Sequence, residues 1–253
     1  MYKIFKATFF ILLMMNLWAG TVSAYDEVIP VEMEGNEAVV TFLEGSAVVC
    51  TEGGATSSPL KLHAKLQNGD RVTTGHETRI ELTFTDGSLL RFDEETTFEI
   101  ININYSMETR ERDINVKMVL GRTWANVCSV VGKKGGLSLH AKNAVAGVRG
   151  TVYRMNVAKD NSTVVKVYSG EVTVQKPSQI AAPTPSKVKS PQPVPGPHPV
   201  PGPKKVSMEK WTYIVRAMQQ IAINPDGTIE EPTTFSAQAD SNEWVRWNQK
   251  RDQ

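Results

Sequence analysis

Short apolar stretches separated by turn residues follow one another from Ala38 to Val174. Within them apolar and polar positions alternate, as at Ile80, Leu82 and Phe84, whose intervening residues are polar. This period of two is typical of strands with one buried and one solvated face, and no helical period persists here. The pattern predicts strands over Val39–Leu43, Ala47–Cys50, Arg79–Thr85, Leu89–Phe92, Thr97–Asn102, Asn115–Leu120, Thr123–Val131, Gly150–Val157, Thr163–Tyr168 and Glu171–Val174.

Residues that tolerate positive φ stand between these stretches, including Asn68-Gly69-Asp70, Asp86-Gly87, Leu120-Gly121 and Ser169-Gly170. Such residues form the tight turns that join neighbouring strands. Many short strands at this spacing favour an all-β domain, and the pattern by itself leaves a sandwich, a barrel and a solenoid open.

After this domain the chain becomes rich in proline, from Pro177 to Pro203. Proline has no amide hydrogen to give to a sheet and favours polyproline II conformation. We therefore expect residues 177–203 to be a semi-rigid linker that separates the β domain, residues 25–176, from a tail, residues 204–253.

The tail contains apolar residues at helical spacing from Trp211 to Ile221, which predicts a short amphipathic helix. A second helix is predicted from Asp240, with Glu243 three residues later as a capping box and with Trp244 and Trp247 on one face. The three tryptophans, Trp211, Trp244 and Trp247, could stack on a sugar or peptide of a partner, although indoles at this spacing more often dock on the protein itself.

The first 24 residues have the composition of a secretory signal peptide. Lys3 and Lys6 precede a mostly apolar stretch, and Val22-Ser23-Ala24 places small residues where a signal peptidase cleaves. The apolar stretch is shorter than the ~20 residues of a membrane-spanning helix. We expect cleavage after Ala24, no stable transmembrane anchor, and a periplasmic or secreted mature protein.

Charge is nearly balanced, with 28 lysines and arginines against 27 acidic residues. Such a balance gives no long-range field to attract a polyanion, so no nucleic-acid partner is expected.

The expected export also bears on the redox state of Cys50 and Cys128, the two cysteines of the chain. An oxidising compartment would let them form a disulfide, and two separate buried thiols are the alternative. The spacing of the two cysteines along the sequence does not decide between these possibilities.

No catalytic, cofactor-binding or metal-binding constellation is recognisable in the sequence. The four histidines do not pair with one another, with cysteine or with aspartate at ligand spacing. The glycine-rich stretch 132–136 lacks the spacing of a phosphate-binding loop. The acidic run Asp93-Glu94-Glu95 is expected to face solvent at the end of a strand. These observations predict a protein that is not an enzyme and holds no cofactor.

Three ordered motifs and a closing ribbon nevertheless form a recognisable series. Ala144–Tyr153 contains the run A-V-A-G-V-R-G-T-V-Y, which resembles the signature of the FecR-like domain family. Gly69–Gly75 and Asp86–Leu90 resemble that family's G-D-x-[IV]-x-T-G turn and D-G-S hairpin, and Val165–Val174 resembles its closing ribbon. The motif residues are Gly69, Asp70, Asp86, Gly87, Gly147, Arg149, Gly150 and Thr151.

The resemblance implies a compact, twisted β-solenoid-like or β-roll domain. Arg149 is a single charge within an apolar run, between Gly147 and Gly150. A charge in such surroundings needs a partner, so we expect its guanidinium to cap backbone carbonyls or to pair with an acid, with a ligand contact as the less favoured alternative.

In this family the domain often forms the exported sensing half of a transmembrane regulator that acts on a sigma factor. The present chain has no recognisable cytosolic segment or retained membrane helix, which puts direct sigma-factor regulation in doubt. The expected function is recognition of a protein or ligand, or scaffolding, in the bacterial cell envelope, with a role in signalling left open. A polysaccharide-binding or cell-wall-binding module is the alternative, and a carbohydrate-active β-solenoid enzyme is less favoured.

Overall fold

The computed structural model is mostly β, and its described residues lie within Met33–Gln253. The described residues are 36–51, 56–106, 108–109, 111–129, 135–148, 150–177 and 211–253. The predicted leader, Arg149 and the predicted linker from residue 178 onward lie outside them.

Seventeen strands and one helix occur within the described residues. They are β1 (Ala38–Glu44), β2 (Ala47–Cys50), β3 (Ser58–Pro59), β4 (Lys65–Leu66), β5 (Arg71–Thr74), β6 (Arg79–Phe84), β7 (Leu89–Phe92), β8 (Thr97–Tyr105), β9 (Arg112–Val127), β10 (Gly135–His140), β11 (Val145–Val148), β12 (Thr151–Val157), β13 (Thr163–Ser169), β14 (Glu171–Gln175), β15 (Thr212–Arg216), β16 (Gln219–Ile223), β17 (Thr233–Thr234) and α1 (Glu243–Arg251).

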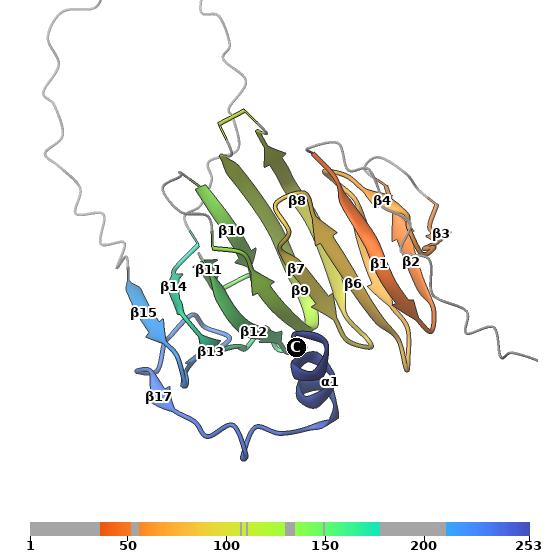
Figure 1. Cartoon of the computed structure of the whole chain (residues 1–253). Coiled ribbons are helices and arrows are strands. Elements are labelled where there is room, and N and C mark those ends of the chain that lie inside the picture. The colour runs from red at the N-terminus through yellow and green to blue at the C-terminus, as the bar shows by residue number, and fades with distance from the viewer. Residues whose placement is uncertain are drawn as a thin grey trace, which may run out of the picture. The chain divides into compact units, whose positions relative to one another are not determined.

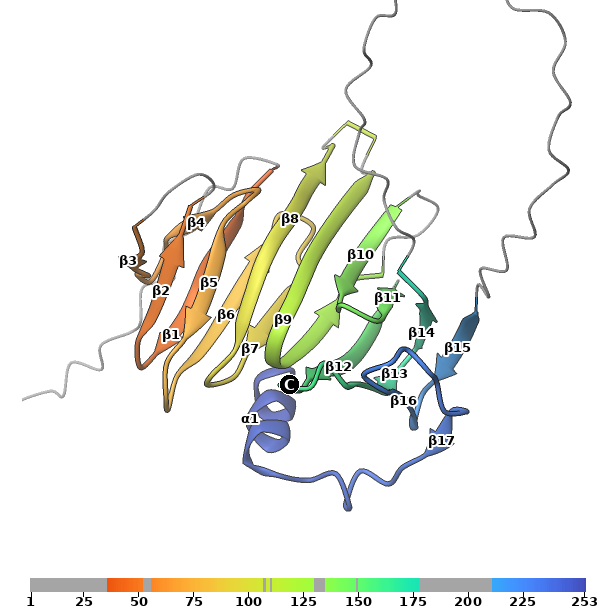
Figure 2. The same ribbon diagram turned by 180° about the vertical axis from the view of Figure 1, so that it is seen from behind.

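The strands form one large mixed sheet that follows two ladders (Figure 1). The first ladder has the order β4-β1-β6-β7-β9-β12-β13-β16-β17. The second has the order β3-β2-β5-β8-β9-β10-β11-β14-β15. Figure 2 shows β5, β8, β9 and β10 of the second ladder side by side. Among the described pairings, β9 with β10 is parallel and the others are antiparallel.

Strand β9 belongs to both ladders and joins them. Its residues up to Leu120 pair with β8, and those from Gly121 onward pair with β12. The turn predicted at Leu120-Gly121 is therefore a bend within one strand. Gly121 has a φ of +105°, and a Cβ placed there would lie 2.2 Å from Oγ1 of Thr96, so the bend requires glycine.

The hydrophobic core lies between the two ladders. Phe92 of β7 in the first ladder stacks on Phe98 of β8 in the second, with ring centroids 3.7 Å apart. Alternate residues of each strand point inward, as the period of two predicts. The core includes Ile80, Leu82, Phe84, Leu90, Ile100, Val116, Tyr153, Met155, Val165, Val167, Val172 and Val174, all buried.

The structure corrects the prediction of a helix from Trp211 to Ile221. This segment forms strands β15 and β16, which pair with β14 and β13 and so extend both ladders. The backbone groups of an otherwise unpaired edge strand favour the addition of a further strand. Local spacing could not show that these edges were free, and that is why the helical interpretation was wrong.

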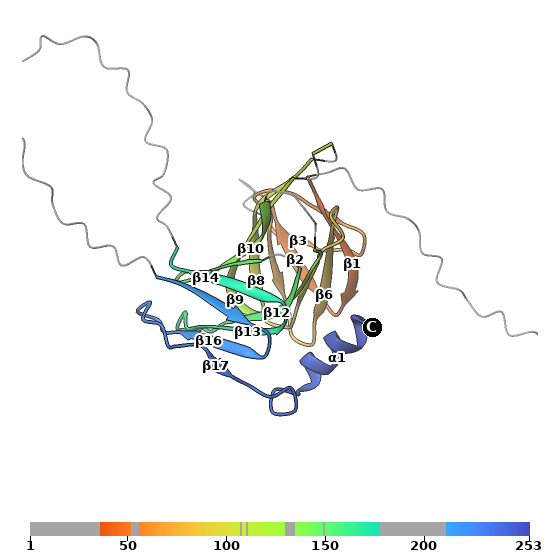
Figure 3. The same cartoon turned by 60° about the vertical axis from the view of Figure 1, so that its left-hand side comes forward.

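The second predicted helix is confirmed as α1, but it begins later than expected. Its N-cap is Asn242, whose side chain accepts a hydrogen bond from the Val245 amide at 2.9 Å, and not Asp240. Trp244 and Trp247 lie on one face of the helix, with ring centroids 5.4 Å apart. Figure 3 shows α1 on the side of β6 and β12, away from β8 and β14.

Candidate binding site

Seven residues on seven adjacent strands of the first ladder lie directly opposite one another. Their neighbours along the chain, such as Leu90 and Phe92 on β7 or Tyr153 and Met155 on β12, point into the core. The seven side chains therefore lie on the outer face, where directly opposed residues have Cβ atoms ~5 Å apart. We call this set the outer row: Phe42, Glu81, Arg91, Trp124, Arg154, Lys166 and Gln220.

Asp240, just before α1, contacts one part of the outer row. Its carboxylate accepts hydrogen bonds from Nη2 of Arg154, from Nε of Arg154 at 3.2 Å and from Nζ of Lys166 at 2.8 Å. The Tyr168 hydroxyl on β13 donates a further hydrogen bond to it. One carboxylate thus satisfies three side chains from β12 and β13.

Asp252, at the end of α1, contacts the middle of the outer row. Nη1 of Arg91 lies 2.7 Å from Asp252 Oδ1, and the Trp124 indole nitrogen donates to Asp252 Oδ2 at 2.9 Å. The other side of the Arg91 guanidinium is held within the ladder, because Nε donates to Glu81 Oε2 at 2.6 Å. Arg91 therefore links the domain's own acid to an acid of the C-terminal segment.

Aromatic side chains of the helix cover the Phe42 end of the row. Trp247 lies 5.5 Å from Phe42 between ring centroids, and the Arg251 guanidinium lies 4.4 Å from the Phe42 centroid. Trp244 and Val245 are buried in a small cluster with Trp124. Trp244 and Trp247 are thus docked on the protein, whereas Trp211 packs at the edge of the core beside Tyr213.

This cover removes the central members of the outer row, from Glu81 to Arg154, from solvent, and leaves Phe42, Lys166 and Gln220 partly exposed. Arg91 is 1% exposed and Arg154 is 6% exposed. The expectation that the second face of each strand is wet is wrong for these strands, because α1 and the residues before it lie over that face.

Electrostatics favours the ionised acids at this interface. Burial alone would raise the pKa of Asp240, but the hydrogen bonds from Arg154, Lys166 and Tyr168 outweigh burial and hold its pKa below the ordinary value. Burial would likewise raise the pKa of Glu81, and the hydrogen bond and charge of Arg91 reverse the effect, so its pKa is lowered. Both acids therefore remain charged where they meet the arginines.

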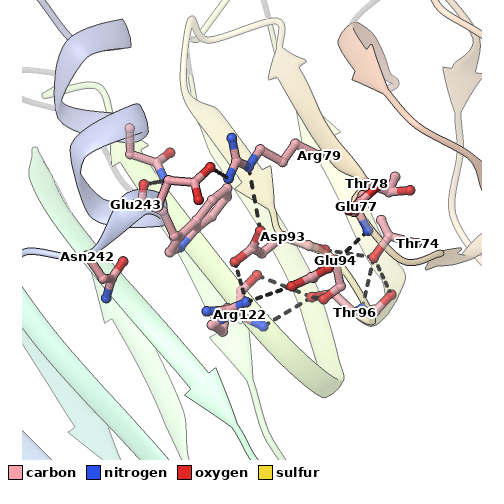
Figure 4. Close-up of polar contacts among 12 residues, drawn as sticks. Thr74, Glu77, Thr78, Arg79, Asp93, Glu94, Thr96, Arg122, Asn242 and Glu243 are labelled. Atoms are coloured by element: carbon pink, nitrogen blue, oxygen red, sulfur yellow. Dashed lines mark hydrogen bonds and ion pairs between the residues drawn. The ribbon is translucent and has the colours of Figure 1, made fainter.

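A polar cleft of about 660 Å³ lies beside the first turn of α1. In Figure 4, Arg79 lies between Glu243 of α1 and Asp93, and Arg122 approaches Asp93 and Glu94. Arg79 Nη2 is 2.7 Å from Glu243 Oε1, and Arg122 Nη2 is 2.8 Å from Asp93 Oδ2. The lining residues are Glu44, His76, Glu77, Thr78, Arg79, Asp93, Glu94, Arg122, Asn242, Glu243 and Trp244.

The acidic run that was expected to face solvent instead takes part in this network. Asp93 is buried, Glu94 is half-buried and only Glu95 is exposed. Burial raises the pKa of Asp93 above its ordinary value, against the opposing charge of Arg122. The hydrogen bond from Arg79 lowers the pKa of Glu243. The network therefore joins the helix to the first ladder by ion pairs.

The upstream motif residues have structural roles away from the outer row. Gly69 has a φ of +86°, and the Asp70 carboxylate accepts a hydrogen bond from the Gln67 amide at 2.8 Å, which closes the turn before β5. Gly87 has a φ of +82° in the turn between β6 and β7. Asp86 forms a buried ion pair with Arg112, which also donates to the Cys128 carbonyl at 2.8 Å.

The downstream motif residues lie where the chain passes from β11 to β12. Gly147 is on β11, and a Cβ there would lie 3.6 Å from Oγ of Ser138. Gly150 has a φ of +62°, and a Cβ there would meet Ser129 at 2.8 Å. The buried Thr151 hydroxyl donates to the Glu171 carbonyl at 3.0 Å. The described motif residues therefore fix turns and crossings, and do not line the cleft.

The possible disulfide does not form between Cys50 and Cys128, both of which are described. Cys50 ends β2 and pairs in register with Arg71 of β5, whereas Cys128 follows β9. Cys50 thus lies in the second ladder, whereas Cys128 follows the part of β9 in the first ladder and its amide donates to Ser88 Oγ beside β7. Burial raises the pKa of the Cys128 thiol, with the charge of Asp86 adding to the effect.

The described part of the chain offers neither a metal-binding cluster nor a membrane-spanning helix. No three histidine, cysteine, aspartate or glutamate side chains in it group so that they could hold a metal ion. No helix in it is both long and apolar enough to cross a membrane.

Sequence reasoning missed the outer row as a candidate binding site. Arg91 and Arg154 occupy outward positions of alternating strands, where arginine is ordinarily a solvated residue. A signal was present in the tail, where Asp240 and Asp252 flank the two tryptophans of α1. The partners of these two aspartates could be inferred only by knowing which strands α1 covers.

Comparison with known protein families finds one match within the described sheet. The family model described as FecR protein matches residues 70–173. Residues 70–173 form a FecR domain. Five members of the outer row, from Glu81 to Lys166, lie inside this FecR domain, whereas Asp240 and Asp252 lie outside it.

Two crystal structures of a candidate anti-sigma factor from Parabacteroides distasonis are similar to the chain. One has 17% sequence identity and a TM-score of 0.46, and the match covers 71% of this chain and 64% of that protein. The other has 18% identity and a TM-score of 0.44, covering 66% of this chain and 61% of that one. The chain thus spans less than two thirds of either protein. A search of curated proteins finds no match.

Proposed function

We propose that this protein is a non-enzymatic recognition protein of the bacterial cell envelope whose FecR domain binds a protein partner. The observation that carries the proposal is the outer row, a sheet face that holds a polypeptide segment through arginine–aspartate pairs and aromatic contacts. Arginine and aromatic residues in a desolvated patch are the groups that dominate protein recognition.

The family resemblance supports the same proposal, since exported FecR-like domains often act in sensing. It also supports a roll-like or solenoid-like description of the fold, which remains a prediction. The alternation of strands between two ladders along the chain is consistent with it.

Binding of a polysaccharide is the alternative, and one observation weighs against it. Stacking on sugars needs exposed aromatic faces, whereas Trp244 is buried and Trp247 is covered on one side by Trp244 and contacts Phe42. A carbohydrate-active enzyme is less favoured still, because the acids Asp93, Glu94 and Glu243 at the cleft are engaged by arginines.

Affinity capture from an envelope extract tests the proposal. The full mature chain is immobilised, and an exported β protein of similar charge serves as the control. We expect a protein to be retained by this chain and not by the control. Retention of glycan alone, or turnover of a glycan panel, would contradict the proposal and favour one of the alternatives.

Export is the second part of the proposal, and N-terminal sequencing of protein from the envelope fraction tests it. We expect a mature terminus at Tyr25, because Val22 and Ala24 fit the small-residue requirement of a signal peptidase. A protein that retains Met1 in the membrane pellet would contradict this expectation.

A further inference from the structure

Two arginines of the outer row take carboxylate partners from the C-terminal segment. Within the described residues, Asp240 is the acid that lies in ion-pair distance of Arg154. Arg91 has Glu81 on one side of its guanidinium and takes its second carboxylate from Asp252. The FecR domain therefore presents two places that bind a carboxylate, on strands β7 and β12, which are separated by β9 alone.

The face beneath the helix is polar enough to be exposed to water when the helix leaves. Of its seven residues only Phe42 and Trp124 are apolar or aromatic, and the others carry charges or an amide. Departure of the helix would thus uncover the charged row together with Phe42, Trp124, Val152 and Tyr168, in which the aromatic and apolar side chains are interspersed with charges and do not form a large apolar patch of the kind that promotes aggregation.

The segment that covers the row has the properties of a bound peptide. Helix α1 has nine residues, of which Trp244, Val245 and Asn248 are buried. A helix of this length is marginal in water by itself, so it depends on the surface that it covers. Its contacts to the row are ion pairs, hydrogen bonds and aromatic contacts, through Arg251 to Glu81, Asn248 to Arg91 and Trp247 to Phe42, and a second ligand with the same groups could make them equally well.

We propose that the outer row is a binding site for an amphipathic helix of a partner protein, one that carries a tryptophan pair between two aspartates. The chain's own segment from Asp240 to Asp252 occupies this site as an intramolecular competitor. This inference rests on the proposed function and names the chemistry of the partner. Charge complementarity identifies the occupant, because the site pairs one carboxylate with Arg154 and Lys166 and the other with Arg91.

A labelled peptide tests the competition in the full mature chain. The probe is a fluorescein-labelled peptide of residues 239–253, and fluorescence anisotropy measures its dissociation constant. In the doubly substituted chain Asp240→Asn/Asp252→Asn the internal segment loses its carboxylates while every row residue is kept. We expect this chain to bind the peptide at least tenfold more tightly than the unsubstituted chain, which holds its own segment in place.

Two controls make the result specific. Glu231→Gln removes an exposed carboxylate of the same tail and should leave peptide binding as in the unsubstituted chain. A peptide with both aspartates replaced by asparagine should bind the opened chain at least tenfold more weakly. If the double variant does not fold, Asn242→Ala takes its place, because it removes the helix cap and leaves the row intact.

Equal peptide affinity for the opened and unsubstituted chains would overturn the inference, and so would equal binding of the peptide without aspartates. Dimerisation of the opened chain without peptide binding, seen by analytical ultracentrifugation, would identify a second copy as the occupant and also overturn it. Capture of an envelope protein by the unsubstituted chain would still stand in each case, so failure of this inference is distinguishable from failure of the proposed function.

Discussion

Asp252 Oδ1 lies 2.7 Å from Nη1 of Arg91, although 161 residues separate the two along the chain. The same guanidinium contacts Glu81 on the neighbouring strand β6. Because Arg91 lies between Glu81 of the domain and Asp252 of the tail, the binding of the tail to the sheet depends on the charges of these residues. The same dependence holds at Asp240, whose carboxylate pairs with Arg154 and Lys166.

Replacement of Asp240 by asparagine should destabilise the protein by about 3 kcal/mol near pH 7, because it leaves Arg154 buried without its acid. The pKa of Asp240 is lowered in the folded state, so its contribution is fully present above its unfolded pKa, about 4. The contribution is lost as the pH falls through the lowered folded-state value.

Urea unfolding of both proteins from pH 7 down to pH 3 checks this prediction. The difference in the free energy of unfolding should be constant down to about pH 5 and should shrink below about pH 4. Glu231→Gln is the control and should change stability by less than about 0.5 kcal/mol. A difference that persists undiminished at pH 3 would show that the effect does not come from the charge of Asp240.

Asp86→Ala should be far more damaging than Glu99→Ala. The ion pair of Asp86 with Arg112 is buried, with side chains 1% and 2% exposed, whereas Glu99 and Lys117 are 32% and 47% exposed. Removal of one partner of a buried pair costs about 3 to 5 kcal/mol, and an exposed pair contributes about 1 kcal/mol or less. Thermal and urea unfolding measure both. Equal losses would mean that the D-G-S motif does not stabilise the fold through Arg112.

Gly121→Ala and Gly227→Ala form a matched pair at positive φ. Both residues have a left-handed φ, of +105° and +83°, but a Cβ at Gly121 would meet Thr96 whereas one at Gly227 would have nothing within 4 Å. We expect about 1 kcal/mol of destabilisation at Gly227 from backbone strain and at least about 3 kcal/mol at Gly121, where a clash is added. Similar values in urea unfolding would argue against a close approach of the β9 bend to Thr96 in the turn between β7 and β8.

Limited trypsin digestion should cut first in the proline-rich segment, at Lys187, Lys189, Lys204 or Lys205, where the sequence predicts a linker. The two pieces should remain together on gel filtration, because β15 and β16 pair with β14 and β13. Separation of the pieces without denaturant would contradict the incorporation of the tail into the ladders. First cuts within residues 38–174 would instead show that the linker is misplaced.

Local pattern was enough to place the predicted strands and the second helix. Alternating residues such as Ile80, Leu82 and Phe84 face the core as expected, because the two faces of a strand are set by its backbone. The motif residues Asp86 and Gly87 form the turn that their types favour. These features depend on residues a few positions apart, which is the range that a sequence pattern reports.

The binding site could not be obtained in this way. Phe42, Arg91 and Lys166 share one row because three strands distant in sequence align in register, and register depends on the whole ladder. The segment 212–223 formed two strands, one added to the edge of each ladder, because free strand edges were available to it, which outweighed its helical spacing.

The sequence by itself thus determined strands such as β6, β7 and β12, the turn at Asp86-Gly87, the FecR motifs and the aromatic helix, but not strands β10, β11, β15 and β16. The tertiary structure decided that the polar face of the first ladder is covered, that Arg154 meets Asp240 and Arg91 meets Asp252, and that Cys50 and Cys128 lie apart. The physical reason is the range of the interactions, since local conformation depends on neighbouring residues, whereas burial of a charge depends on an acid 86 or 161 positions away.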